Sequence, residues 1–338
     1  MNQPILPAED KLPIVTSSPH VHHHSSTRSI MGDVIISLFP ALLWGIYVFG
    51  LRALVLTGVS ILSCVLSELL YEKIFWQRVT VGDLSAVVTG LLLALSLPVS
   101  VPLWLPAIGG VFAIVVVKMI FGGIGKNVVN PALAARVFLF LSFPSQMSRS
   151  VGAFPGKLPL FADVDAVSTA TPLAALKNHL LPEENLFDLI LGTVGGSIGE
   201  TSAILLTLGF VYLLIRRVVK PHIPLAYLLS FALLCLLFPQ IEHATFLYLV
   251  YELFSGGLLL GAFFMATDTV TSPITLPGKV LFGIGCGILT FVIRTFGGYA
   301  EGVSFAILMM NLPVWYLDLF TRPTYFGQIK KKKESSDE

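Results

Sequence analysis

A run rich in hydroxyl side chains lies in the middle of the chain. The run reads Asp165-Ala166-Val167-Ser168-Thr169-Ala170-Thr171-Pro172. Taken by itself, a threonine before proline is an ordinary helix start, with Thr171 as the N-cap and Pro172 in the first turn. The hydroxyl spacing alone therefore predicts a capped helix and no particular cofactor.

Carboxylates at the edges of apolar segments are candidates for ion handling, because polar groups at membrane depth are costly and suggest function by default. Asp268 stands beside threonine hydroxyls, and carboxylate and hydroxyl oxygens suit a hard cation. The alternative is that each carboxylate only caps a helix end or is hydrated. The three candidates for the ion pathway are Asp268, Asp83 and Asp318.

Other kinds of chemistry find little support. Cys64, Cys235 and Cys286 lie far apart in apolar runs without a CxxC pattern, so neither a zinc site nor an iron–sulfur cluster is expected. The chain has no Gly-x-Gly-x-x-Gly fingerprint after a strand, so no pyridine-nucleotide site is expected in it. We assign no catalytic residue and no metal ligand.

The composition requires a membrane. Apolar residues make up 55% of the 338 residues and charged residues 12%, and the mean hydropathy is +0.84. Soluble domains carry about 25% charged residues. A net charge of +1 argues against a nucleic-acid partner.

Ten apolar runs are long enough to be candidate transmembrane helices, which need about 20 residues each. Arg136 lies inside one of them and requires a partner, either a buried acid, a flavin phosphate or another subunit. The runs cover 33–50, 53–71, 82–100, 104–121, 127–146, 200–218, 222–238, 244–266, 279–296 and 302–320.

An even number of spans places both termini on one side. Outside the spans, the segments on the side of the termini contain fourteen lysine and arginine residues, and the segments on the other side contain five. Because positive residues are enriched on the cytoplasmic side, this predicts cytoplasmic N- and C-termini. The long loop over 147–186, with Thr171, then lies on the outer face.

The two halves repeat at a constant offset of 175 positions. Pro98 matches Pro273, Pro102 matches Pro277, and Phe121-Gly122-Gly123 matches 296–298. Because each half has five spans, the second half must be inverted, and such repeats place a site at interrupted helices near the midplane. The prolines predict the interruptions. The expected parts are a tail (1–30), a first five-helix repeat (31–146), an outer loop (147–199), a second repeat (200–320) and a charged tail (321–338).

The hydroxyl-rich run also resembles the flavinylation signal Asp-Gly-x-Ser-Gly-Ala-Thr, whose last threonine receives FMN through a phosphoester bond. Positions 166 and 169 hold alanine and threonine in place of its two glycines. The residues that match are Asp165, Ser168, Ala170 and Thr171.

Further segments resemble the family that contains the D-type subunit of the Rnf complex and the B-type subunit of the Na+-pumping NADH:quinone reductase. They cover 25–31, 122–132, 199–202, 265–273 and 296–311. The resemblance implies a ten-helix, 5+5 inverted-repeat fold like that of urea channels, with broken helices. It also implies covalent FMN on the outer side and a noncovalent riboflavin nearer the cytoplasm. Lys126, Asn127 and Asn130 are the riboflavin candidates, and a helix start with a cytoplasmic anchor is an equal alternative.

By the same resemblance, the chain is an inner-membrane component of an ion-translocating ferredoxin:NAD+ oxidoreductase, inactive alone, which relays electrons as Na+ or H+ crosses. Its expected partners are a flavinylated G-type subunit, a ferredoxin-like cluster subunit, an NADH-binding subunit and small membrane subunits. Two alternatives stay open: a component of the quinone reductase, or a passive solute channel or transporter of the urea-channel type.

Overall fold

The computed structural model describes residues 26–76, 79–154, 160, 171–182, 184–200, 202–241 and 244–323. Over these residues the fold is built from helices, without a β-strand. Most of both expected tails, residues 1–25 and 324–338, lies outside this part of the chain, as do Asp165, Ser168 and Ala170 of the predicted flavinylation signal.

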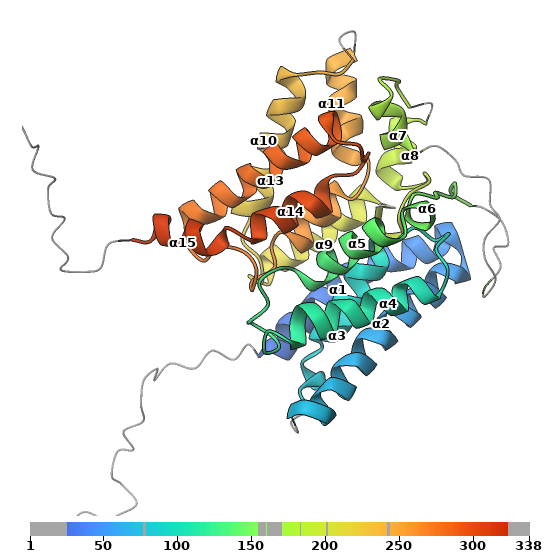
Figure 1. The fold of residues 1–338 in the computed structure, drawn as a ribbon. Helices are drawn as coiled ribbons and strands as arrows, with labels where there is room; N and C mark the ends of the chain where they lie inside the picture. Colours follow the sequence, from blue (N-terminus) through green and yellow to red (C-terminus); the bar gives the residue numbers. More distant parts are fainter. Residues whose placement is uncertain are drawn as a thin grey trace, which may run out of the picture.

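The first half forms helices that gather on one side of the molecule, coloured blue to green in Figure 1. Ser26 begins the first helix as its N-cap, where its hydroxyl accepts a hydrogen bond from the Ser29 N–H. The elements are α1 (Thr27–Phe49), α2 (Leu51–Tyr71), η2 (Glu72–Trp76), η3 (Val81–Asp83), α3 (Ser85–Leu95), α4 (Trp104–Val111), η4 (Phe112–Met119), α5 (Pro131–Ser142) and α6 (Pro144–Met147).

The second half begins with short helices of the loop region and continues with longer ones. The elements are α7 (Pro172–Lys177), α8 (Leu186–Leu191), η5 (Ile198–Glu200), α9 (Ala203–Ile215), α10 (His222–Leu237), α11 (Thr245–Phe254), α12 (Leu258–Leu260), η7 (Gly261–Met265), α13 (Leu276–Phe296), α14 (Val303–Asn311) and α15 (Val314–Thr321). The halves meet where α1 contacts α9 and where α5 contacts α14 (Figure 1).

Helix length and hydropathy are those of an integral membrane protein. Within the described residues, three helices are long and apolar enough to span a bilayer, or up to five if each of two bent pairs counts as one span. The bent pairs turn by 60° between α11 and α12 and by 56° between α14 and α15. Large apolar side chains also face outward, such as Leu62 (61% exposed) and Leu229 (67%), as expected where lipid is the solvent.

Both proline elements lie between helices, as the sequence predicts. The helix α3 ends at Leu95, short of the predicted span 82–100, because Pro98 and Pro102 lack the N–H that a continuing helix needs. In the matching element, Pro273 precedes α13 and Pro277 lies in its first turn, after the N-cap Thr275, which accepts from the Gly278 N–H at 3.2 Å.

Glycines bring α10 and α13 into close contact. A Cβ at Gly283 would lie 2.7 Å from the Ile223 carbonyl oxygen, and one at Gly287 would lie 2.8 Å from that of Tyr227. Small residues permit this approach, which membrane helices use because no hydrophobic effect drives them together.

Candidate functional site

A cavity of about 320 Å³ opens beside Thr171, and we call it the Thr171 cavity. It lies between α5, α7, the segment before η5, the break between α11 and α12, and the segment before α14. Its volume falls in the range of about 300–1,000 Å³ that small-molecule sites occupy. The lining includes Arg136, Thr171, Glu200, Ser255 and Glu301.

Thr171 is the N-cap of α7, as its position before Pro172 predicts. Its backbone is extended, and its Oγ accepts a hydrogen bond from the Ala174 N–H at 3.3 Å. Because the oxygen accepts in this contact, replacing the hydroxyl proton by a phosphoester does not remove the acceptor. Thr171 is half-buried, on the wall of the cavity.

The Thr171 cavity also contains polar atoms that lack a partner. The hydroxyl oxygens of Ser150 and Ser255 are buried and make no hydrogen bond within the described residues. Buried polar groups are nearly always satisfied in folded proteins. The cavity is therefore suited to a polar guest, either water or a ligand.

Arg136 has the buried acidic partner that its position in an apolar span requires. Its guanidinium donates from Nη1 to Glu301 Oε1 at 2.9 Å and to Ser304 Oγ at 2.9 Å, and from Nη2 to Glu301 Oε2. Glu200 Oε1 lies 3.9 Å from the same Nη2. No local pattern indicated which acid this would be, since Arg136 and Glu301 are 165 positions apart.

Lys177 ties α7 to the end of α13. Its ammonium group donates to the carbonyl oxygens of Arg294 (3.2 Å), Gly297 and Tyr299 (2.9 Å). Burial lowers the pKa of Lys177, against the opposing field of Glu252. Because Thr171 caps the other end of the same short helix, Lys177 helps to hold the threonine at the cavity.

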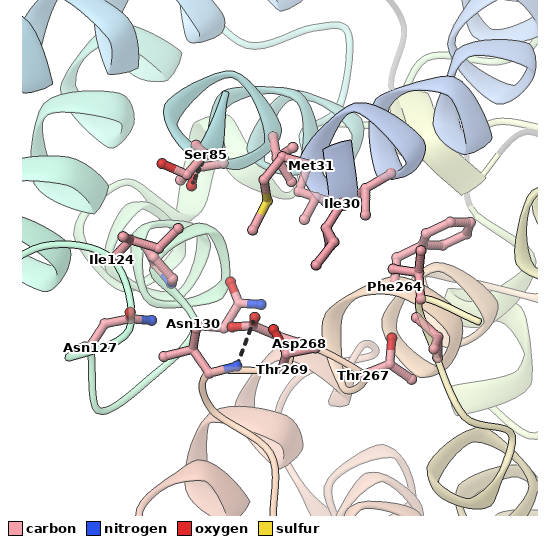
Figure 2. Close-up of a pocket in the computed structure, with 18 of the residues that line it drawn as sticks. Ile30, Met31, Ser85, Ile124, Asn127, Asn130, Phe264, Thr267, Asp268 and Thr269 are labelled. Carbon is pink, nitrogen blue, oxygen red and sulfur yellow. Dashed lines mark hydrogen bonds between the residues drawn. The ribbon is translucent and has the colours of Figure 1, made fainter. Parts of the chain in front are cut away.

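A second cavity, of about 100 Å³, contains several of the other predicted site residues, and we call it the Asp268 cavity. Figure 2 shows Asp268 and Asn130 within it, with Asn127 to one side and Met31 of α1 opposite. Lys126 is exposed and is not one of its lining residues; its aliphatic chain lies over Gly122.

The two asparagines make local contacts. Asn130 caps α5, accepting from the Ala132 and Leu133 N–H groups, and its amide donates to the Met265 carbonyl oxygen. The Asn127 amide donates to the Val129 carbonyl oxygen. This is the geometry of a helix start, and the cavity is smaller than the smallest ligand pockets of about 300 Å³. A riboflavin site here stays a prediction.

The three predicted ion-pathway carboxylates do not meet at one point. Asp268 accepts from the Val270 N–H at 3.3 Å and from Thr271 Oγ1 at 3.0 Å. Asp318 accepts from the N–H groups of Ile274 and Thr275, which joins α15 to the segment before α13. Each of these carboxylates thus orders a segment between helices.

Asp83 belongs to a buried polar chain that the sequence did not predict. It accepts from Ser85 Oγ at 2.6 Å, Ser85 Oγ accepts from Lys118 Nζ at 2.6 Å, and Lys118 pairs with Glu68 at 2.8 Å. Ser85 and Lys118 also line the Asp268 cavity, so this chain connects Asp83 to its wall. Among the described residues no group of His, Cys, Asp and Glu suits a metal ion.

The fold and the two cavities define an all-helical integral membrane protein with buried ion pairs and a loop threonine on a ligand-sized cavity. The chain belongs to the NQR2, RnfD, RnfE family, whose sequence profile matches residues 14–327. This confirms the family that the sequence motifs indicate.

Three relatives, each the D component of its complex, illustrate the similarity. The chain is 44% identical to that of the Na(+)-translocating ferredoxin:NAD(+) oxidoreductase complex of Acetobacterium woodii over 324 residues, 95% of this chain and 97% of the relative. It is 40% identical to that of the proton-translocating ferredoxin:NAD(+) oxidoreductase complex of Clostridium ljungdahlii, over 93% and 96%. It is 36% identical to that of the ion-translocating oxidoreductase complex of Halorhodospira halophila, over 94% and 96%.

Proposed function

We propose that this chain is the D-type membrane subunit of an ion-translocating ferredoxin:NAD+ oxidoreductase, and that it carries covalent FMN on Thr171. The names of relatives 36–44% identical over nearly the whole chain support the complex. The partners are then the other subunits of that complex, and the translocated ion is Na+ or H+. As one subunit of an electron-transfer complex, the chain does not turn over substrate without the other subunits.

The observation that carries the flavin proposal is the position of Thr171, a half-buried hydroxyl on a cavity of about 320 Å³. The residues present fit the group. Thr171 Oγ would hold the phosphate, and the unpartnered hydroxyls of Ser150 and Ser255 offer hydrogen bonds to polar atoms. When bound, FMN supplies one- and two-electron redox chemistry, which protein side chains cannot.

The protein supplies position and electrostatics around that cavity. Thr171 is held by its cap contact and by the attachment of Lys177 to the end of α13. Arg136 is held by Glu301 and Ser304, which fixes a guanidinium in the wall of the same cavity. Arg294 donates to Glu252 at 2.7 Å and to the Ser255 carbonyl oxygen at 3.1 Å, which orders the break beside the cavity.

We further propose ten spans in the inner membrane, arranged as a 5+5 inverted repeat with cytoplasmic termini. The three long helices, two bent pairs and five shorter apolar helices correspond one for one to the ten predicted runs. Shifting the bounds of α1 by 175 gives 202–224, which contains α9, and α1 and α9 contact each other. The same shift carries α5 onto 306–317, which overlaps α14, and that pair is also in contact.

The flavin proposal predicts that Thr171→Ala abolishes covalent flavin. In cells that possess the attaching enzyme, the wild-type band should fluoresce under ultraviolet light in a denaturing gel, and the Thr171→Ala band should be dark. Thr193→Ala is the matched control, because Thr193 is a hydroxyl of the same loop region that bonds to Asp188 instead. An equally bright Thr171→Ala band of equal amount would refute the attachment site.

A further inference from the structure

The wall of the Thr171 cavity holds two carboxylates, Glu200 and Glu301, and two guanidinium groups, Arg136 and the exposed Arg149. Arg136 donates to Glu301 from both of its terminal nitrogens, so this carboxylate uses most of the hydrogen-bonding capacity of the guanidinium group. Glu200 Oε1 is 3.9 Å from Arg136 Nη2, beyond a hydrogen bond. The side chain of Arg136 is 11% exposed, that of Glu200 is 15% exposed and that of Glu301 is 21% exposed. Among the described residues Arg136 is the only cation within 4.0 Å of Glu200, and it is already bonded to Glu301, so Glu200 lacks a close ion partner of its own.

The other nearby cations do not form a close ion pair with Glu200: Arg149 lines the same cavity but does not come within 4.0 Å of that carboxylate. Arg294 is paired with Glu252 at 2.7 Å, which leaves that pair neutral. Lys177 directs its ammonium group at the carbonyl oxygens at the end of α13. A buried carboxylate without a close ion partner lowers its free energy by binding a proton. The cost of leaving such a charge unpaired is several kcal/mol, similar to the cost of breaking a buried ion pair.

A second observation indicates that a proton has a route. Ser255 is 2% exposed and Ser150 is 6% exposed, and both unpartnered hydroxyls line the same cavity as Glu200. A cavity of about 320 Å³ is large enough to hold several water molecules. Water in contact with these hydroxyls would connect the carboxyl group with the solvent.

We propose that Glu200 is a proton-exchange site on the Thr171 cavity, protonated at rest and adjacent to the Arg136–Glu301 ion pair. Its link to redox chemistry depends on the proposed function. When held on Thr171, FMN would supply the redox chemistry, with electrons from a redox carrier in a neighbouring subunit, and the O–H bond of Glu200 would break to deliver the proton that accompanies reduction. The carboxylate then regains a proton from cavity water, so that charge and protons balance.

The test is infrared difference spectroscopy of the purified full-length chain carrying Thr171→Ala. This substitution removes the proposed attachment site, so the result for Glu200 does not depend on flavin attachment. At neutral pH, a protonated-carboxyl band should be present and should shift in D2O. The band should be lost on Glu200→Gln and kept on Asp188→Asn, a change at a carboxylate of α8 that bonds to Thr193. Glu301→Gln should also remove it, because Arg136 is then free to pair with Glu200.

A second measurement uses the flavinylated protein. The midpoint potential of the bound flavin should depend less steeply on pH in Glu200→Gln than in wild type. A neutral-pH spectrum without any band that Glu200→Gln removes would overturn the proposal, as would a band that does not shift in D2O. A dark wild-type band in the gel assay together with a Glu200 band would refute flavin attachment and leave the proton site standing.

Discussion

Lys118 shows how a single residue is held at membrane depth. It is 3% exposed, and its ammonium group donates to both oxygens of Glu68 and to Ser85 Oγ. Glu68 itself is 1% exposed. A buried pair of this kind adds little net stability compared with apolar residues, but removing one partner leaves a charge without compensation.

We therefore predict that Lys118→Met destabilises the protein by about 3–5 kcal/mol, the cost typical of breaking a buried ion pair. Adding Glu68→Leu should restore most of that loss, because the stranded carboxylate is then absent. Unfolding of the detergent-solubilised protein measures both effects, with Lys73→Met at an exposed lysine as the control. A single variant as stable as wild type would contradict this role of the pair.

At the scale of single residues, the sequence predicted contacts between residues that are close together in the chain. The N-cap at Thr171 follows from that residue and the proline after it, and Asn130 caps α5, in agreement with the helix start that was one of the two alternatives for its segment. Ion partners could not be predicted, because the Arg136–Glu301 pair joins positions far apart in sequence. Apolar residues surround each of these charges in the chain, and only packing decides which of them meet.

The helices follow from apolar runs and their proline interruptions, and their bounds agree with the predicted runs to within several residues in most cases. The bend between α11 and α12 was not predicted, because 244–266 reads as one continuous apolar run. There Ser255 is extended and Gly256 has φ +69°, a value that favours glycine, so the helix stops and restarts. This break forms part of the Thr171 cavity.

The proposed topology predicts opposite sides for two exposed positions, Ser145 after α5 and Lys220 before α10. In spheroplasts, a membrane-impermeant maleimide should label Ser145→Cys directly and Lys220→Cys only after the membrane is permeabilised. The native Cys64, Cys235 and Cys286 are buried, so the unmodified chain serves as the blank. Labelling of both positions from one side would contradict the ten-span arrangement.

Considered as a whole, the molecule places two polar cavities within a helical bundle that presents apolar side chains to its surroundings. One contains Asp268 and borders the Glu68–Lys118 pair, and the other contains Thr171 and the Arg136 cluster. Such an arrangement suits a membrane protein that holds a redox group on one side and admits ions or protons elsewhere. Covalent flavin on Thr171 is the central element of this account.

The most direct test is the intact mass of the wild-type chain purified from its native membrane. We predict a mass that exceeds the sequence value by one FMN less one water, with the added mass located on the peptide that contains Thr171. An unmodified mass, or a modification on any other peptide, would contradict the account.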